Sequence, residues 1–369
     1  MPGPNQYYVD PAIAANSGTG TLGDPFGDLQ YCLNTITRST TVGDQINIKA
    51  GTAEVMSASI SLATYGTPTK LILAGYTAAA DDGGIGEITF GGTNADVFSA
   101  TSNIDLRCLK IGNFGTGFLR TTGTVSLCEI YNFTGSIVTS SSNGFIHNHV
   151  HTHSGTNLCV QVNATFCFQN LIRSSTNWVV LYGNGSGLSA VENVVVHSNA
   201  TGNALEAFTI GSNFSIIGNS VINTAAGTGR GIAWNCTTVP NSGIIANNIV
   251  QGWNGTGGRA FGPNGGTRPC FMLRSNRWFN CATGVAGTAG ADYMAASDNS
   301  VLSATPFTDV ANLDFRVSSE VASLGWPTSL RSAPLSTQFK DLGALQRVAG
   351  SSSGSLINSQ QLVRAGWIQ

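Results

Sequence analysis

An asparagine or small residue followed two positions later by an apolar residue recurs through the middle of the chain, at intervals of 20 to 29 residues. Cys108 extends this series backwards with a poorer fit. A period of this length is typical of stacked supersecondary units, each of which buries its apolar face only against a neighbour. The repeat therefore predicts a solenoid, and its instances are Cys128 with Ile130, Asn148 with Val150, Asn170 with Ile172, Asn193 with Val195, Asn219 with Val221, Asn247 with Ile249, Asn276 with Trp278 and Asn299 with Val301.

The local pattern around each asparagine predicts strands. Residues two before, at and two after the asparagine share one strand face, because side chains alternate with a period of two. An asparagine can point into a core where its amide is hydrogen-bonded, and stacked amides satisfy one another. We therefore predict parallel strands in register, with an inward face formed by Ile146-Asn148-Val150, Phe168-Asn170-Ile172, Val191-Asn193-Val195, Ile217-Asn219-Val221 and Ile245-Asn247-Ile249.

Turn-forming clusters separate these strands, for example at residues 201–203, 226–229 and 255–258. A leucine-rich repeat would place leucines at fixed offsets beside helical segments, and a propeller needs roughly 40 residues per blade. Neither pattern is present in the sequence. The pattern predicts an all-β fold, a single-stranded parallel β-helix of about ten coils stacked at about 4.8 Å per coil.

Segments outside the repeat have the character of end caps. Residues 7–9 read as a short strand, and residues 43–51 read as a turn followed by the first strand of the stack. Between them, Asp24 is a cap residue and Pro25 suits the first helical position, and an apolar stripe follows at Leu29, Cys32, Leu33 and Ile36. We divide the chain into an N-terminal strand and capping helix (1–45), a parallel β-helix (46–302), a C-terminal cap (303–350) and a linker with a docking tail (351–369).

The C-terminal segment combines a flexible linker with a short apolar peptide. Residues 351–354 are Ser-Ser-Ser-Gly, which is a linker composition. About fifteen residues cannot bury an apolar surface alone. We predict that this tail docks on another subunit rather than on its own β-helix, through Leu356, Ile357, Leu362, Val363, Trp367 and Ile368.

Composition and charge exclude several classes of protein. Only 10% of the residues are charged, 41% are hydrophobic and 46 are glycine, which fits a folded, turn-rich β protein. The net charge is −2 and the basic residues are scattered, so we expect neither nucleic-acid binding nor membrane insertion. The first six residues lack the charged and apolar regions of a secretory signal. Cys108 and Cys128 fall in the inward column, so we expect reduced thiols and assembly in a reducing compartment.

Short motifs at both ends resemble those of a known superfamily. Near the start they are residues 8–10 (YVD), 18–21 (GTGT), 25–30 (PFGDLQ), 43–46 (GDQI) and 49–52 (KAGT). Near the end they are residues 314–317 (DFRV) and 341–346 (DLGALQ). Over residues 7–347 the chain resembles right-handed parallel β-helix proteins of the pectate-lyase-like superfamily, and this resemblance implies the hand of the β-helix.

The resemblance leaves the activity open, because the superfamily contains polysaccharide lyases and hydrolases as well as phage tail spikes, fibres and other virion proteins. The paired aspartates and Gly-His-Gly arrangement of the polygalacturonases are absent from this sequence. So is the aspartate cluster with a nearby Arg or Lys that calcium-dependent pectate lyases use. No catalytic residue is therefore carried over from the superfamily.

The most chemically suggestive segment contains four of the five histidines, at alternating positions. If the asparagine column points inward, these histidines point outward. Aligning neighbouring repeats places Glu129 beside His149 and Tyr131 and Arg173 beside His151. The predicted outer-surface constellation is Glu129, Tyr131, His147, His149, His151 and Arg173, with His153 on the same face.

Three interpretations of this constellation compete. Alternate histidines on a strand have the separation of metal ligands, and a three-fold assembly could complete the coordination. A histidine or arginine could instead abstract a proton from a uronic acid, with Glu129 orienting it. The third interpretation, which we prefer, is a polar surface or subunit interface without a metal, a cofactor or a catalytic residue.

Other residues give weaker signals. Asp81 and Asp82 lie in a glycine-rich loop and read as a turn rather than a calcium site. Glu129 and Glu192 are three repeats apart, too far for the carboxyl pair of a glycosidase. Trp178, Trp234, Trp253 and Trp278 could form a sugar platform, although packing is the better interpretation.

The resemblance to this superfamily, together with the absence of its enzyme motifs, implies a bacteriophage virion structural protein, a non-enzymatic head-decoration or tail-appendage β-helix that is made in the host cytoplasm. We expect a homotrimer that contacts other capsid or tail proteins, with a cell-surface glycan as a further candidate partner. The main alternative is a polysaccharide lyase or glycoside hydrolase of the superfamily. The second alternative is a glycan-binding adhesin.

Overall fold

The computed structural model describes residues 3–62, 70–91, 96–99, 103–140, 144–156, 158–163, 166–176, 178–184, 188–209, 214–236, 243–265, 271–287, 295–312 and 314–318. These residues fall into two compact units, one that ends at Gly155 and one that begins at Thr156. Residues 319–350 of the expected C-terminal cap and the whole predicted docking tail, Leu356, Ile357, Leu362, Val363, Trp367 and Ile368, lie outside the described residues.

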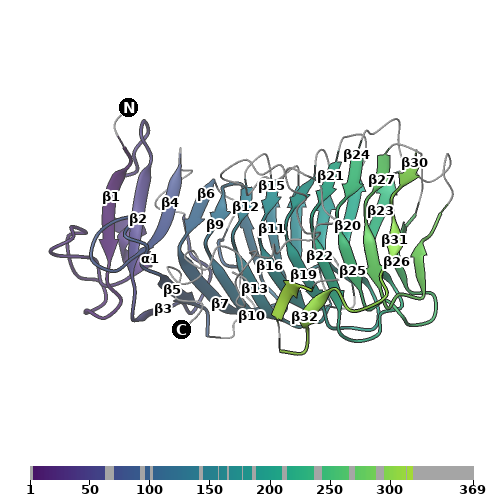
Figure 1. Ribbon diagram of the computed structural model, residues 1–369. Coiled ribbons are helices and arrows are strands. Elements are labelled where there is room, and N and C mark those ends of the chain that lie inside the picture. The colour runs from purple at the N-terminus through teal and green to yellow at the C-terminus, as the bar shows by residue number, and fades with distance from the viewer. Residues whose placement is uncertain are drawn as a thin grey trace, which may run out of the picture. The chain divides into compact units, whose positions relative to one another are not determined.

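The first unit contains three parallel sheets, and Figure 1 shows their strands as successive rungs. The first sheet has the order β1 (Asn5–Val9), β2 (Asp44–Lys49), β4 (Leu71–Tyr76), β6 (Ile104–Arg107), β9 (Val125–Ser126) and β12 (Gly144–Ile146). The second has the order β3 (Ala53–Val55), β5 (Gly86–Thr89), β7 (Leu109–Gly115), β10 (Glu129–Phe133) and β13 (His149–His153). The third pairs β8 (Phe118–Thr121) with β11 (Ser136–Ser140).

The second unit has the same three-sided plan. Its first sheet contains β15 (Phe166–Phe168), β18 (Ser189–Val191), β21 (Phe214–Ile217), β24 (Gly243–Ala246), β27 (Phe271–Arg274) and β30 (Ala295–Ser297). The second contains β16 (Leu171–Ser174), β19 (Val194–His197), β22 (Ser220–Asn223), β25 (Ile249–Gln251), β28 (Arg277–Phe279) and β31 (Ser300–Val301). The third contains β14 (Val160–Asn163), β17 (Val179–Asn184), β20 (Asn203–Thr209), β23 (Arg230–Cys236), β26 (Arg259–Pro263) and β29 (Thr283–Val285). An antiparallel pair, β32 (Phe307–Asp309) and β33 (Asp314–Val317), follows.

The predicted all-β, parallel β-helical fold is confirmed. In both units each strand pairs in parallel with the strand one coil later, and the residues that face the interior are buried and mostly apolar. A strand of five or six residues cannot bury its apolar face alone, so each coil depends on the coils that cover it. The core of each unit therefore lies inside the coil, and side chains on the outer faces are free to carry other chemistry.

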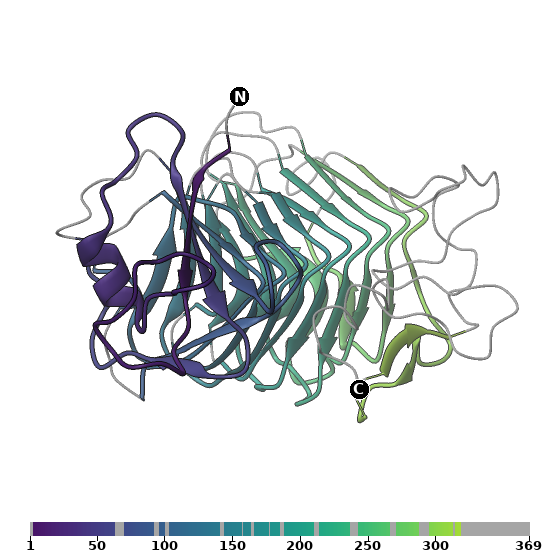
Figure 2. The same ribbon diagram turned by 90° about the vertical axis from the view of Figure 1, so that its left-hand side faces the viewer.

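The capping helix is present but begins later than predicted. It is α1 (Leu29–Thr35), and Figure 2 shows it beside the first strands of its unit. Its N-cap is Asp28 rather than Asp24, because the Asp28 carboxylate accepts a hydrogen bond from the Tyr31 N–H at 2.6 Å. The predicted apolar stripe is buried at Leu29, Cys32 and Leu33, as a helix that covers an open coil requires.

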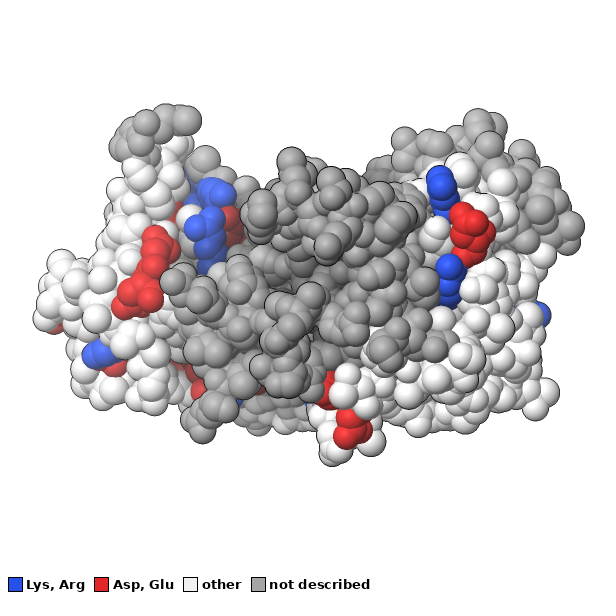
Figure 3. Space-filling model, viewed as in Figure 1, with Lys and Arg blue, Asp and Glu red and all other residues white. Residues whose placement is uncertain are grey.

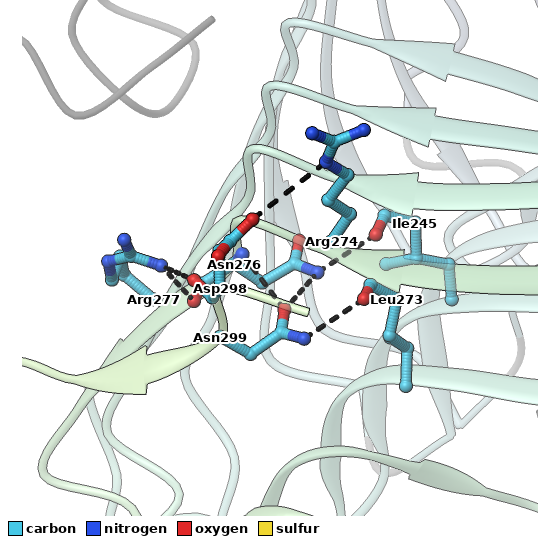
Figure 4. Close-up of polar contacts among 7 residues, drawn as sticks. All are labelled: Ile245, Leu273, Arg274, Asn276, Arg277, Asp298 and Asn299. Carbon is cyan, nitrogen blue, oxygen red and sulfur yellow. Dashed lines mark hydrogen bonds and ion pairs between the residues drawn. The ribbon is translucent and has the colours of Figure 1, made fainter. Parts of the chain in front are cut away.

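An asparagine ladder runs through the second unit, as the repeat predicts. At each step the backbone N–H and the side-chain Nδ2 of one asparagine both donate to the Oδ1 of the asparagine in the next coil, at 2.9 to 3.0 Å for Asn193 on Asn219. Figure 4 shows the last step, in which Asn276 donates to Asn299 and each also donates to a backbone carbonyl. Hydrogen bonds of this kind satisfy the polar atoms that the ladder places in a core.

One ladder position was predicted incorrectly. Asn219 donates to Asn248, and Asn248 in turn donates to Asn276, so Asn248 rather than Asn247 is the ladder residue. Asn247 has φ +57°, a left-handed conformation that asparagine adopts more readily than most residues. In the first unit, Cys108 also has positive φ, so its predicted place in the inward column is wrong and buried Leu109 takes that place.

The same left-handed residue explains why the predicted continuous strand is wrong. The residue before each ladder position has φ between +53° and +66°, and it turns the chain from the first sheet into the second. This turn reverses the alternation of inward and outward side chains, so the inward residue of the first sheet lies three positions before the asparagine, not two. Phe145, Cys167 and Ile216 are accordingly buried, whereas the predicted inward residues Ile146, Phe168 and Ile217 are only half-buried.

Candidate functional site

The four clustered histidines do not share one outer face. His147 occupies the left-handed corner with φ +56°, and His149 and His151 lie half-buried on β13. His153 is only 2% exposed, so its predicted outward orientation is wrong. The cause is Thr152, whose φ of +55° reverses the alternation a second time within the same segment.

His153 packs in the core and has a structural role. Its ring packs on Phe133 with the ring centroids 4.8 Å apart, and its Nε2 donates to the carbonyl oxygen of Gly135 at 2.9 Å. Burial lowers the pKa of His153 to about 4, because the charged imidazolium loses its hydration inside the coil. The side chain is therefore neutral at pH 7 and extends an aromatic stack that Phe114 and Phe133 begin.

The outer face of the second sheet in this unit does hold a polar cluster. Glu129 lies directly opposite His149 on the neighbouring strand, and Tyr131 lies opposite His151, which is the register that the repeat predicts. His151 Nε2 donates to Glu129 Oε1 at 2.9 Å. The rings of His149 and His151 lie 4.5 Å apart, so the three polar side chains form one contiguous group.

Two members of this cluster were missed from the sequence. Glu87 on β5 and Lys110 on β7 extend the same row, in the order Glu87, Lys110, Glu129, His149. We call these four residues the alternating column. Their signal was available, because the alignment that relates Glu129 to His149 also relates Lys110 and Glu87 one and two coils earlier. It was hidden because those earlier coils contain no ladder asparagine to fix the register.

The cluster is hydrogen-bonded within itself. The Tyr131 hydroxyl donates to Glu87 Oε1 at 2.7 Å, and Lys110 Nζ lies 3.9 Å from the same oxygen and 4.8 Å above the centre of the Tyr131 ring. Tyr131 can reach across because Gly112 lies beneath it, where a Cβ atom would stand 2.4 Å from the ring. Each carboxylate of the alternating column thus has a cationic or hydroxyl partner.

Electrostatics make Glu129 and Tyr131 poor general bases. The hydrogen bond from His151 lowers the pKa of Glu129, with smaller contributions of the same sign from Lys110 and His149, although burial acts in the opposite direction. Burial and Glu87 raise the pKa of Tyr131, so its phenol stays protonated. A general base works best with a pKa near the working pH and a free lone pair, and neither group offers both.

Arg173, the last member of the predicted constellation, lies on β16 in the second unit. It is half-buried, and burial lowers the pKa of its guanidinium. Glu192 also belongs to that unit, where it fills a left-handed corner with φ +54° and accepts a hydrogen bond from Gln169 at 2.8 Å.

The remaining predicted residues have packing or turn roles. Asp82 accepts backbone hydrogen bonds from Thr77, Ala78, Ala79 and Gly84, which confirms the turn interpretation of Asp81 and Asp82 and lowers the pKa of Asp82. Trp234 and Trp253 are fully buried, whereas Trp178 is 58% exposed. The four tryptophans therefore do not make a common platform.

A second polar group lies where the described coils of the second unit end. Figure 4 shows Arg274 Nε directed at Asp298 Oδ2, 3.9 Å away, and Arg277 donating to the Asp298 carbonyl oxygen. Beside them is an open hollow of about 420 Å³ that Trp278, Gly284 and Asn299 help to line. On the face shown in Figure 3, charged residues of the described chain lie in small groups of mixed sign.

No group of three or more His, Cys, Asp or Glu side chains with metal-binding geometry is found among the residues that the structure describes. α1 is the one helix among these described residues, and it is not long and apolar enough to cross a bilayer.

Comparisons with known proteins give similarity of fold. No family model matches the chain, and no curated protein matches its sequence. Similar solved structures include a rhamnogalacturonan lyase (12% identity, 80% of this chain and 86% of that chain, TM-score 0.44). Pectate lyase Pel9A has 12% identity over 94% and 98% of the two chains with a TM-score of 0.49. The catalytic domain of a GH87 α-1,3-glucanase in complex with tetrasaccharides has 10% identity over 81% and 69%, with a TM-score of 0.34.

These neighbours are pectate-lyase-like parallel β-helix proteins and related glycan-active enzymes. At identities this low, no statement about the activity of the present chain follows from their names.

Proposed function

We propose that the chain is a non-enzymatic structural protein of a bacteriophage particle, either a head-decoration protein or a tail appendage. The observation that carries the proposal is that both carboxylates of the alternating column are hydrogen-bonded to neighbouring side chains of the same polar cluster. His151 holds Glu129 and Tyr131 holds Glu87, at 2.9 and 2.7 Å. We interpret side chains that are engaged in this way as stabilising an outer surface.

Buried thiols support assembly in a reducing compartment such as the host cytoplasm. Cys32, Cys108, Cys128, Cys159, Cys167 and Cys281 are free. Burial raises the pKa of Cys128 and of Cys167 to about 12, so neither forms the thiolate that disulfide exchange requires.

Exposed apolar side chains support assembly with further subunits. On the second unit Trp178 is 58% exposed and Val301, on the last strand of its sheet, is 65% exposed. In an assembly, a partner subunit would cover these apolar side chains. We propose a homotrimer that contacts other capsid or tail proteins, with residues 356–368 as the docking tail and a cell-surface glycan as a further ligand.

The second candidate is a polysaccharide lyase or glycoside hydrolase. It is favoured by the residue types in the cluster, because a carboxylate, an imidazole and a phenol within hydrogen-bonding distance are the parts that proton abstraction uses. A glycan-binding adhesin would need the same outer surface without turnover.

The test combines localisation with an activity assay on the full chain. Peptides of this protein should be found by mass spectrometry in purified particles produced from the encoding genome, and sedimentation should give a trimer. The wild-type protein should release no product from acidic polysaccharides. Absence from the particles, together with turnover that Glu129→Gln abolishes and Trp178→Ala leaves intact, would establish the enzyme instead.

A further inference from the structure

Two arginines stand directly opposite each other in the third sheet of the second unit. Arg230 begins β23 and Arg259 begins β26, and the two residues are register partners on neighbouring parallel strands. Neighbouring strands lie about 4.8 Å apart, and like charges directly opposite each other destabilise a sheet. Arg230 is half-buried, and its guanidinium pKa is lowered first by burial and then by Arg259.

Both side chains run along their strands toward the same glycine. A Cβ atom on Gly262 would stand 3.2 Å from Arg259 Cδ and 3.7 Å from Arg230 Cδ. The aliphatic parts of both side chains therefore lie against the same small residue. The two side chains therefore extend along neighbouring strands in the same direction.

The nearby carboxylate is already occupied by other donors. Glu206 on β20 is 3% exposed and accepts hydrogen bonds from Asn203 Nδ2 at 2.9 Å and from Asn264 Nδ2 at 2.8 Å. Arg230 Nη1 donates to Asn264 Oδ1 at 3.0 Å, so it is connected to Glu206 only through an amide. Glu206 thus fixes Asn264 and, through it, Arg230.

Donor groups are left over. Among the described residues the side chain of Arg259 has no hydrogen bond or ion pair, and Arg230 Nε is buried without an acceptor. A guanidinium carries five N–H donors in a planar fork that matches an oxyanion. The two guanidinium groups carry more positive charge and more hydrogen-bond donors than the one nearby carboxylate, Glu206, can satisfy, because amide groups already donate to that carboxylate.

We propose that Arg230 and Arg259 bind an oxyanion group, a sulfate, phosphate or carboxylate, with Asn264 as a positioning residue. The anion accepts hydrogen bonds from both guanidinium groups and removes their mutual repulsion. Charge-assisted, two-pronged hydrogen bonds of this kind are the strong ones in proteins. The site is independent of the structural role proposed above, since a virion protein or an adhesin could equally carry it.

The test is a titration of the full-length protein with sodium phosphate, sodium sulfate and sodium acetate at constant ionic strength, followed by calorimetry and thermal unfolding. Arg259→Met removes one guanidinium group that has no hydrogen bond or ion pair among the described residues, and it keeps an aliphatic side chain beside Gly262, so we expect the fold to be retained. Arg274→Met is the matched control, since this arginine lies on β27 near Asp298. Sulfate and phosphate also stabilise proteins by exclusion from the surface, so only the difference between variants counts.

We expect saturable binding and a rise in unfolding temperature in the wild type and in Arg274→Met, with affinity at least tenfold weaker in Arg259→Met. Response to phosphate and sulfate alone identifies a tetrahedral oxyanion, and response to acetate as well identifies a carboxylate. Equal temperature rises in all three proteins, without saturable heat, would overturn the proposal. A loss of binding in Arg274→Met that matches the loss in Arg259→Met would overturn it too.

Discussion

The alternating column of the first unit and the arginine pair of the second unit meet the same constraint differently. Parallel pairing in register forces residues of neighbouring coils to stand opposite each other. In the first unit Glu87, Lys110 and Glu129 succeed one another, so each charge meets one of opposite sign. In the second unit Arg230 meets Arg259. The first arrangement satisfies itself, whereas the second needs something that the described chain does not supply.

The difference matters because the repeat places residues but does not choose their charges. A cross-strand pair contributes about 0.2–1 kcal/mol, which is small against the burial that holds each coil. A β-helix can therefore tolerate a repulsive pair without losing its fold. The fold can therefore form without a bound oxyanion, and the binding proposal rests on the unpaired guanidinium donors.

The largest expected effect is the loss of stability when His153, in the core beneath the alternating column, is protonated. His153 shares β13 with His149 and His151 but is buried, with a pKa lowered to about 4. An unfolded histidine has a pKa of about 6.5, so the unfolded state binds a proton first as the pH falls. The stability present above pH 6.5 is lost between pH 6.5 and pH 4, by about 3 kcal/mol.

His153→Phe should remove this loss, because phenylalanine continues the stack on Phe133 and has no proton to bind. His151→Phe is the control and should keep the acid sensitivity. Thermal unfolding at pH 7 and pH 5, with amide hydrogen exchange in β10 and β13, measures both. Equal acid sensitivity in the two variants would show that the buried histidine is not responsible. His197 on β19 also has a pKa of about 4, so part of the loss of stability at acidic pH should remain in every variant.

The asparagine ladder shows how far the sequence could specify the fold. Asn193, Asn219 and Asn276 were placed correctly because none of them has a second asparagine next to it in the sequence. Asn247 and Asn248 are adjacent, and each is followed two positions later by an apolar residue, Ile249 or Val250. The repeat pattern therefore does not decide which of the two asparagines points inward. The left-handed corner decides it, and residues such as Glu192 at that corner carry no turn signal in the sequence.

The next effect tests the alternating column directly. Lys110→Glu would place three carboxylates in register, in the order 87, 110 and 129, in place of two attractive contacts. We expect a loss of about 1–2 kcal/mol at low salt, decreasing as salt is added. Lys110→Met, which removes attraction without adding repulsion, should lose less than half as much. Urea unfolding at two ionic strengths measures both, and equal losses in the two variants would contradict a charge-based column.

In the second unit, the substitution that replaces repulsion by attraction should increase the stability of the protein. Arg259→Glu turns the repulsive pair with Arg230 into an attractive one and should stabilise the protein by up to about 1 kcal/mol at low salt without added oxyanion. Arg259→Lys keeps the positive charge and should give no gain. Thermal unfolding in chloride at low ionic strength compares them. A destabilising Arg259→Glu would show that Arg259 has a structural role instead.

The sequence could indicate the first region better than the second. Glu129, Tyr131 and His151 were aligned correctly because residues 128–153 span two regular coils with a ladder residue in each. Arg230 and Arg259 are 29 residues apart on the third sheet, where the spacing between coils varies and no repeated residue marks the register. Their convergence on Gly262 depends on side-chain directions that periodicity does not encode.

The smallest expected effect concerns an opposite-charge pair that is not in cross-strand register. Arg274 Nε and Asp298 Oδ2 are 3.9 Å apart, with side chains 51% and 63% exposed. Exposed pairs of this kind contribute about 0–1 kcal/mol because water and salt screen them and both side chains lose freedom. Asp298→Asn removes the charge, and asparagine tolerates the left-handed φ of +55° that Asp298 holds. The carbonyl oxygen that accepts from Arg277 is retained, so unfolding temperatures should agree within about one degree, as expected for less than about 0.5 kcal/mol. A loss of stability as large as that of Lys110→Glu would contradict this expectation. It would mean that the distance between opposite charges, and not their register on neighbouring strands, determines how much they stabilise the protein. The distinction between the alternating column and the arginine pair would then have no basis.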